Sequence, residues 1–284
     1  MKIWSAIQDG TIDTVKLIPF LFITYLLMEY FEHRTSDKTK AAIRRADKMG
    51  PLAGGILGVI PQCGFSASAS SLYSGRMITV GTLVAVYLST SDEMLPIFLS
   101  TGAPAGMIAR VLLIKAVYGI LAGFVIDFLF RRLNERKIGM GIHGLCEREH
   151  CHCEESIVKS SLKHTAGITG YIFLISLALN LLLGVIGTEN LHSLVLNRPV
   201  IGELLAGLIG LIPNCAASVA ITTLYLEGAM SAGAMMAGLM VGAGVGLLVL
   251  FKTNSSKKES AQIAGILYTA GVIGGLATEI FHLL

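Results

Sequence analysis

Two short sequences, "IPQC" ending at Cys63 and "IPNC" ending at Cys215, place a proline, an amide and a thiol inside otherwise apolar stretches. Thiolate sulfur is a soft ligand that suits thiophilic metals and arsenic-like metalloid centres. Proline removes a backbone donor and disturbs the preceding helical turn, so each copy predicts a helix break. Non-helical backbone at membrane depth persists only where protein or water satisfies its polar groups. We therefore expect both cysteines to face an interior cavity.

Amides and hydroxyls beside the two thiols extend the predicted site. We expect the amides to orient the cargo or hydrogen-bond with it, and the hydroxyls to line the same cavity. The alternative is that the prolines are packing kinks and the cysteines small buried hydrophobes. The predicted substrate-binding residues are Gln62, Cys63, Ser66, Asn214, Cys215 and Ser218, and the predicted helix breaks are Pro61, Gly64 and Pro213.

Asp92 and Glu93 lie within a long apolar stretch, in the sequence "STSDEMLP". Acids inside a membrane are energetically costly and usually functional. We predict that they bind a cation or carry protons for antiport, with Lys115 as a candidate partner of Asp92. The alternative is a turn that reaches the membrane surface and leaves both acids solvated. The matching positions of the second copy hold no acid, which suits a single asymmetric coupling site.

A third group of candidate ligands gathers between residues 143 and 153, in "HGLCEREHCHC". Dense Cys/His tracts are typical of metal binding, but this one lacks the Cys-x2-Cys spacing of a zinc finger. In a reducing cytoplasm its thiols should stay free. We predict a flexible, accessory chelating loop, with an inert linker as the alternative. The predicted loop ligands are His143, Cys146, His150, Cys151, His152 and Cys153.

Membrane helices are the elements that must position these groups. Of the 284 residues, 53% are hydrophobic and 14% charged, and the mean hydropathy is +0.69. A soluble chain is usually about a quarter charged, so this composition indicates a polytopic membrane protein. The sequence has neither a nucleic-acid-binding motif nor the Gly-rich phosphate loop of an ATPase. We therefore expect no enzyme activity, no cofactor and no nucleic-acid partner.

The chain repeats itself: the surroundings of Cys215, from "LIGLIPNC" to "TTLYLE", match those of Cys63 at one constant offset. Such internal symmetry is typical of secondary transporters that bind their substrate at the interface between repeats. Each half offers four apolar stretches. They are 14–31, 52–73, 77–103 and 106–130 in the first half, and 167–187, 203–226, 229–251 and 260–283 in the second.

Charge predicts the topology. Residues 34–48, 131–163 and 252–258 hold sixteen of the 22 Lys and Arg residues, and cytoplasmic loops carry this excess. If every stretch crossed once, the first two clusters would lie on opposite sides. We therefore predict that the third stretch of each half folds back, as a re-entrant hairpin or two short spans, turning at Ser89–Pro96 and Val241–Gly246. The number of crossings per half is then odd, so the halves are inverted.

The predicted fold is an all-α, polytopic membrane protein of two inverted-topology repeats. Each repeat has about five transmembrane segments and contains broken or re-entrant helices. The first repeat spans residues 12–131, a cytoplasmic His/Cys-rich linker spans 132–165, and the inverted second repeat spans 166–284. We expect a bacterial inner membrane protein with both termini outside and the central loop in the cytoplasm.

The block "IPQCGFSASASSLYSGRMITVGTLVAVYLSTSDEMLP", its "IPNCAAS" echo and the His/Cys-rich loop resemble the ten-span heavy-metal exporter family. That family is named after the ArsP arsenical permeases, and its members are labelled arsenic efflux proteins or manganese transporters. The resemblance covers nearly the whole chain. It implies transport, leaves the cargo open between thiol-seeking and oxygen-seeking ions, and brings no established catalytic residues.

These observations predict a secondary-active transporter that exports a heavy-metal or metalloid species with proton coupling. One alternative keeps the fold and changes the cargo to a hard divalent cation such as manganese, or to a small anion. Two others are a membrane-embedded thiol redox protein and a metal sensor that reports through its His/Cys loop. The expected partners are the metal or metalloid ion, the lipid bilayer and a second copy in a homodimer.

Overall fold

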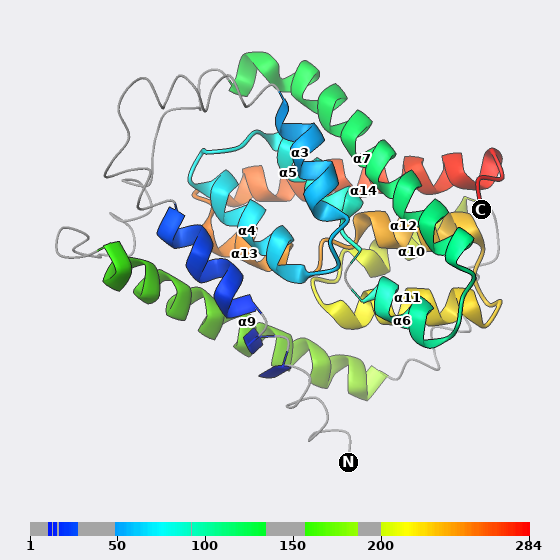
Figure 1. Ribbon diagram of the computed structural model, residues 1–284, viewed down its shortest axis with the longest axis horizontal. Helices are drawn as coiled ribbons and strands as arrows, with labels where there is room; N and C mark the ends of the chain where they lie inside the picture. Colours follow the sequence, from blue (N-terminus) through cyan, green and yellow to red (C-terminus); the bar gives the residue numbers. More distant parts are fainter. Residues whose placement is uncertain are drawn as a thin grey trace.

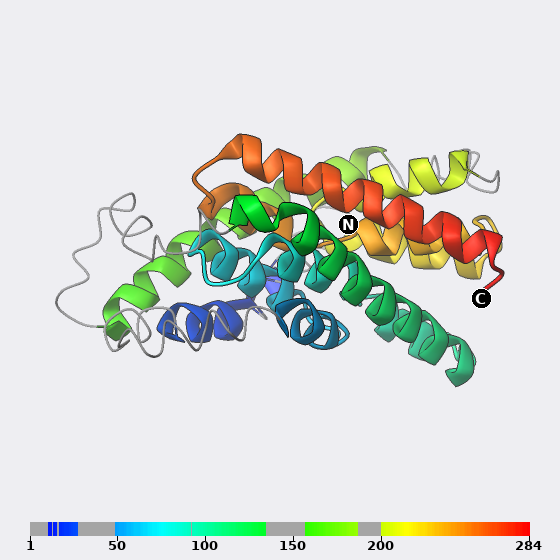
Figure 2. The same cartoon turned by 90° about the horizontal axis from the view of Figure 1, so that it is seen from above.

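The computed structural model is helical throughout the residues that it describes, which are 11–12, 14–15, 17–27, 49–91, 93–134, 157–186 and 200–284. Most helices run along the long axis of the molecule (Figure 1), as the view from above also shows (Figure 2). A short helix at Leu17–Leu27 comes first. It is followed by α3 (Gly50–Gly58), α4 (Cys63–Ser74), α5 (Val80–Ser89), α6 (Met94–Ser100) and α7 (Ala105–Asn134), and then by α9 (Ile157–Ile186), α10 (Ile201–Gly210), α11 (Cys215–Leu226), α12 (Ala232–Val241), α13 (Gly246–Thr253) and α14 (Lys257–Ile280).

The repeat in the sequence is also a repeat in the structure. The first residues of α4, α5, α6 and α7 each lie 152 positions before the first residues of α11, α12, α13 and α14. Packing recurs as well, because α5 lies between α3 and α7 just as α12 lies between α10 and α14. The halves also exchange helices: α6 packs against α11, and α13 packs against α4. Each half therefore completes the core of the other.

Four stretches among the described residues are long and apolar enough to cross a bilayer: Val80–Ser100, Ala105–Phe130, Ala232–Thr253 and Lys257–Ile280. The stretch made of α12 and α13 is 94% buried within the protein, whereas only 28% of the α7 stretch is buried. The central position thus belongs to α12 and α13, and α7 presents large apolar side chains outward. This surface is that of a multi-pass membrane protein.

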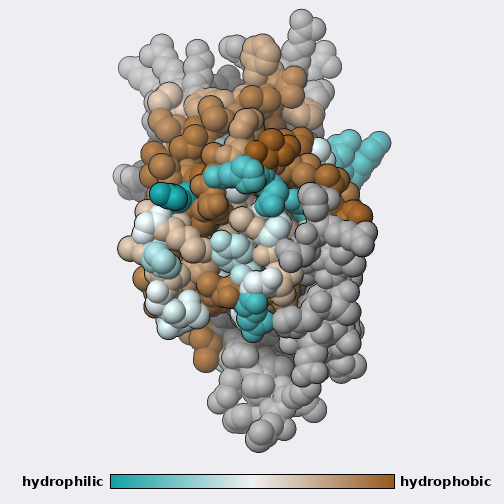
Figure 3. Space-filling model, turned by 90° about the vertical axis from the view of Figure 1, so that its right-hand side faces the viewer, coloured by the Kyte–Doolittle hydropathy of each residue, from teal (hydrophilic) through white to brown (hydrophobic). Residues whose placement is uncertain are grey.

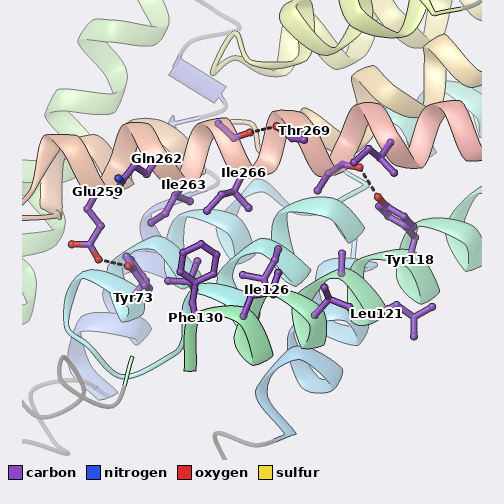
Figure 4. Close-up of a pocket in the computed structure, with 17 residues that line it drawn as sticks. Tyr73, Tyr118, Leu121, Ile126, Phe130, Glu259, Gln262, Ile263, Ile266 and Thr269 are labelled. Carbon is purple, nitrogen blue, oxygen red and sulfur yellow. Dashed lines mark hydrogen bonds between the residues drawn. The ribbon is translucent and has the colours of Figure 1, made fainter. Parts of the chain in front are cut away.

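α7 and α14 run antiparallel, and they define two ends of the molecule. In Figure 4 the numbering of α14 rises from Glu259 to Thr269 in the direction in which that of α7 falls from Phe130 to Tyr118. Between the two helices, the Tyr118 hydroxyl donates a hydrogen bond of 2.6 Å to the carbonyl oxygen of Ala270. We call the end where α14 begins the first end, and the end where α14 finishes the second end.

The second apolar stretch of each half folds back. In the first half α3 runs parallel to α5, since Gly54 packs against Thr82 and Gly58 against Ser89. After the break, α4 returns to the beginning of α5, to which it is joined by the short loop 75–79. The helices α3 and α4 are therefore the two arms of a hairpin, and its tip is the sequence "VIPQ" between them.

The prediction that the third stretch folds back is wrong. Gly119 of α7 packs against the end of α5 at Leu88, so the first half of α7 extends beyond α5. Because α6 ends just before α7 begins, α6 must continue past α5 in the same direction. The stretch Val80–Ser100 is thus one interrupted span. The physical reason is that α6 packs on α11 of the other half, and not on α5.

Candidate metal site

The tips of the two hairpins meet at the centre, where the Sγ atoms of Cys63 and Cys215 lie 3.2 Å apart. Each cysteine is the first residue of a helix, α4 or α11, directly after the break that holds Pro61 or Pro213. A disulfide would need a sulfur–sulfur distance of about 2.05 Å, so the two cysteines are not joined by one. Because the two cysteines are 152 positions apart, this contact joins equivalent positions of the two repeats.

Glu93 completes a group of three potential metal ligands. One carboxylate oxygen of Glu93 and the two thiol sulfurs all lie within 4.8 Å of one another. Glu93 directly precedes α6, in the interruption between α5 and α6. The equivalent residue of the second half is Val245, so the thiols are contributed symmetrically and the oxygen by one half alone.

The helix ends around the thiols favour negative charge. Unpaired backbone N–H groups give a helix N-terminus a partial positive charge, which stabilises thiolate and carboxylate groups nearby. Asn214 is nearly buried, and its side-chain oxygen caps α11 by accepting from the Ala216 amide at 3.2 Å. Gln62 precedes α4 in the same position but makes no such cap, and its half-exposed side chain is the one amide with freedom to meet a ligand.

The predicted hydroxyls and the predicted glycine break have structural surroundings of their own. Ser66 is fully buried and donates to the Cys63 carbonyl oxygen at 2.8 Å, within α4. Ser218 is nearly buried and lies beside Gly242 at the end of α12. The prediction that Gly64 belongs to the helix break is wrong, because Gly64 lies inside α4. A Cβ atom added to Gly64 would lie 2.5 Å from the Phe20 ring. These residues shape the wall of the site more than they face its ligand atoms.

Lys115 is a residue of α7 whose side chain reaches the end of α12. Its side chain is 1% exposed, and Nζ donates a 2.6 Å hydrogen bond to the carbonyl oxygen of Leu239, near the end of α12. Asp92 lies outside the described residues, so the pairing of Lys115 with Asp92 stays a prediction. The same holds for the His/Cys-rich loop, residues 143–153, none of which is described.

Two acids in the last helix of each half, Asp127 of α7 and Glu279 of α14, anchor neighbouring helices. Asp127 accepts from the Thr79 hydroxyl at 2.6 Å and from the Gly81 amide at 2.8 Å, at the start of α5. At the equivalent place, the start of α12, Glu279 accepts from the Gly233 amide at 2.7 Å. Each acid thus satisfies a helix N-terminus of its own repeat.

Sequence reasoning missed Glu203, which lies in the first turn of α10. The side chain is fully buried, and among the described residues neither of its carboxylate oxygens has a hydrogen-bond partner. The signal was available, since a single acid stands in the apolar run "VIGELLAGLIG" and such acids are usually functional. The repeat hid it, because the matching position of the first half is Pro51.

A separate groove of about 960 Å³ runs between α7 and α14 and has a mainly apolar lining (Figure 4). At its first end, Arg76 makes a double ion pair with Glu259, with N–O distances of 2.8 and 3.1 Å, and Tyr73 donates to the same carboxylate. Hydrogen bonding to Glu259 raises the pKa of Arg76. The lining of the groove includes neither thiol and not Glu93, so the groove is separate from the candidate metal site.

Comparison with known proteins gives one match. The family described as "Putative, 10TM heavy-metal exporter" matches residues 3–188, which is more than half of the chain. That description is of a transporter and not of an enzyme. No curated protein and no solved structure matches the chain.

Proposed function

We propose that this chain, which belongs to the family of ten-span heavy-metal exporters, is a secondary transporter that exports a thiophilic metal or metalloid ion. The observation that carries the proposal is the meeting of Cys63, Cys215 and Glu93 within 4.8 Å. These residues come from the tips of two hairpins and from the break in a crossing helix. Discontinuous helices that meet between repeats are the usual setting of a transport site.

The distances suit a soft ion. Two metal–sulfur bonds of about 2.3 Å at a tetrahedral angle hold their sulfurs about 3.8 Å apart. The thiols, at 3.2 Å, would need to separate only slightly to bind an ion between them. Two of the three ligand atoms are sulfur, which favours thiophilic cargo over manganese, a cation that prefers oxygen ligands. The single carboxylate adds an oxygen ligand for ions that take both.

An inverted arrangement of the two repeats is part of the proposal. It is supported by the antiparallel α7 and α14, which occupy equivalent places in the two halves. The residues that flank the three basic clusters also support it: Gly50 packs beside Thr82 near the start of α5, α7 finishes beyond Asp127, and α14 begins at Lys257. All three lie at the first end, which we therefore assign to the cytoplasm. The opposite, second end faces the viewer in Figure 3, where hydrophilic and hydrophobic residues are mixed.

Transport by purified protein in lipid vesicles tests the cargo site. Wild-type protein should move at least one thiophilic ion from a panel of Zn²⁺, Cd²⁺ and arsenite, and the double variant Cys63→Ser, Cys215→Ser should move none. Ser100→Ala is the matched control, because the exposed Ser100 hydroxyl bonds only within its own helix, to the Ile97 carbonyl oxygen, and it should transport normally. Intact transport by the double variant, with loss of transport in Glu93→Gln or Asp92→Asn, would favour manganese. Dependence on Lys115 with no effect of either cysteine would favour a small anion.

One observation favours a second candidate, a thiol redox protein: the two sulfurs, 3.2 Å apart, are close enough to form a disulfide after a small movement. That function requires the Cys63–Cys215 pair to cycle between reduced and oxidised forms. Thiol trapping in cells, followed by mass spectrometry, measures the two forms. Cysteines that stay reduced under all growth conditions would rule the redox function out.

The His/Cys-rich loop has an accessory role in our proposal, as a chelator that collects ions at the cytoplasmic face. Deletion of residues 141–155 should then leave transport by purified protein intact and weaken metal resistance of cells at low ion concentrations. Loss of transport in vesicles would instead make the loop part of the pathway, and loss of a metal-dependent signal alone would indicate a sensor.

A further inference from the structure

Glu203 and Glu279 lie against one backbone position at the second end of the molecule. A Cβ atom built on Gly233 would lie 2.8 Å from one carboxylate oxygen of Glu203 and 2.7 Å from one of Glu279. The Glu279 carboxylate accepts a hydrogen bond from the Gly233 amide, whereas the fully buried Glu203 has no hydrogen-bond partner among the described residues. A buried ionised carboxylate without a partner is expensive. A second carboxylate charge beside it, on Glu279, would add to that cost.

The first repeat shows what is missing from the second. There, the Asp127 carboxylate accepts one hydrogen bond from a backbone amide and a second from the hydroxyl of Thr79. In the second repeat the residue equivalent to Thr79 is Ser231. Its hydroxyl caps α12 by accepting from the Ala234 amide, as that of Thr79 caps α5, but among the described residues it makes no hydrogen bond to Glu279. The side chain that stands beside Glu279 is Glu203. It could replace the donor of the first repeat only if it carries a proton.

We propose that Glu203 and Glu279 share one proton and form the proton-binding site that couples export to the proton gradient. This proposal rests on the transport function proposed above and adds to it the place at which the proton binds. In the loaded state, Glu203 donates its O–H to the Glu279 carboxylate, which also holds the start of α12. Release of that proton to water leaves two adjacent carboxylates, which repel each other.

The proton is thereby linked to the helix pair that forms the centre of the molecule. α12 begins at Ala232, beside the pair, and runs to the interruption before α13, next to Ser218 and the hairpin tip of Cys215. Repulsion between the two carboxylates would displace the start of α12, and through it the thiol site. Removing the proton at one end of α12 therefore changes the surroundings of the ion at its other end.

Few other titratable groups face this pair. Among the described elements packed around it, Tyr225 on α11 interacts electrostatically with Glu279, and Tyr268 on α14 donates to the Leu204 carbonyl oxygen beside Glu203. The helices α10, α11 and α12 contain no Lys, Arg or His. The lysines of α14 lie in its first turn, at the opposite end of the molecule. Two further titratable residues lie close to the pair in the chain: Glu227, which caps the end of α11, and His282, whose amide donates to the Glu279 carbonyl oxygen. The described residues therefore supply no basic partner for either acid, and a proton is the ligand that the pair requires.

Two transport assays in vesicles separate coupling from cargo binding. One measures export driven by a pH gradient, and the other measures exchange of labelled for unlabelled cargo at equal pH, using the panel ion that wild-type protein moves. Glu203→Gln keeps the shape of the side chain and can still donate to Glu279. We expect it to reduce gradient-driven export to the level of empty vesicles and to leave exchange intact. Gradient-driven export at the wild-type rate would overturn the proposal.

Asp127→Asn is the matched control, since Asp127 is the equivalent anchor with a hydroxyl as its partner. If it acts only on structure, it should change both assays to the same extent. The double cysteine variant should abolish both, and wild-type protein that fails in both would refute the transport function itself, whatever Glu203 does.

Infrared spectra give a readout that does not depend on transport. The carbonyl band of a protonated carboxyl group should be present in wild-type protein, absent from Glu203→Gln, and restored in Glu203→Asp. If Glu203→Gln were inactive in both assays, this band would still decide: its loss supports the shared proton, and its persistence contradicts it.

Discussion

At the centre of the molecule the two repeats contribute matching residues, Cys63 and Cys215, whereas beside α5 and α12 they contribute different ones. The first repeat anchors α5 with Asp127 and a hydroxyl. The second anchors α12 with Glu279 and places the buried Glu203 next to it. In our proposals the symmetric part, with its soft ligands, binds the cargo, and the asymmetric part, with its acids, carries the proton.

The two repeats have kept the same residue where they contact each other and have diverged beside α5 and α12. Where equivalent positions of the two repeats meet, each ligand residue of one repeat is accompanied by its equivalent from the other. One thiol per repeat therefore produces a pair of thiols. Coupling to a gradient requires the two ends of the molecule to behave differently, and duplication alone gives identical ends. In the coupling that we propose, single differences between the repeats, such as Pro51 against Glu203 and Val245 against Glu93, would supply this asymmetry.

Replacing either thiol alone should have the largest effect, and the same effect in both repeats. We expect Cys63→Ala and Cys215→Ala each to weaken binding of a thiophilic ion at least about a hundredfold, or about 2.7 kcal/mol, because half of the sulfur ligands are lost. Calorimetric titration of purified protein measures the affinity. A loss confined to one of the two variants would contradict a symmetric site.

The glycines at the two anchors should differ in stability. An alanine at Gly81 would bring Cβ to 2.2 Å from the Gly123 carbonyl oxygen, a backbone atom that cannot move aside. At Gly233 the closest atoms, from 2.6 Å, belong to the side chains of Glu279 and Glu203. We expect Gly81→Ala to destabilise the protein by about 2 kcal/mol and Gly233→Ala by less. Thermal unfolding in detergent measures both, and the reverse order would show that the second anchor is the more rigid.

Removing the asymmetric ligand should alter selectivity more than overall binding. Glu93→Gln deletes the anionic oxygen near the thiols and leaves both sulfurs in place. We expect affinity for Zn²⁺ to fall about tenfold and affinity for arsenite to stay nearly constant, since the softer centre depends on sulfur. Competition binding with the two species measures the ratio. An equal loss for both would place Glu93 in the structure of the site and not among its ligands.

Several features of the fold could be predicted from the sequence. The constant offset between the "IPQC" and "IPNC" sequences predicted a repeat, and the helix boundaries recur at that offset. Proline chemistry placed interruptions before Cys63 and Cys215, where α4 and α11 begin. The sequence also singled out Glu93 as an acid of interest, although its approach to the thiols follows from packing between the repeats.

The direction of the chain after each break was not predictable in this way. Both the second and the third stretch of each half are apolar and interrupted, so composition and charge allow either to fold back. The choice follows from the exchange of helices, in which α6 packs on α11 and α13 on α4. Long-range contacts between the halves carry no local signal, and the positive-inside rule only requires that the number of crossings per half be odd.

By itself the sequence determined the membrane class, the duplication and the presence of two thiols at equivalent positions, since these depend on composition and on local chemistry. Only the tertiary structure brought Sγ of Cys63 to 3.2 Å from Sγ of Cys215 and added Glu93 from a third element. It alone set Glu203 beside Glu279, residues that are far apart in the chain. The two acids are close because α10, α12 and α14 pack against one another. Such packing is a property of the folded core and cannot be read from any one segment.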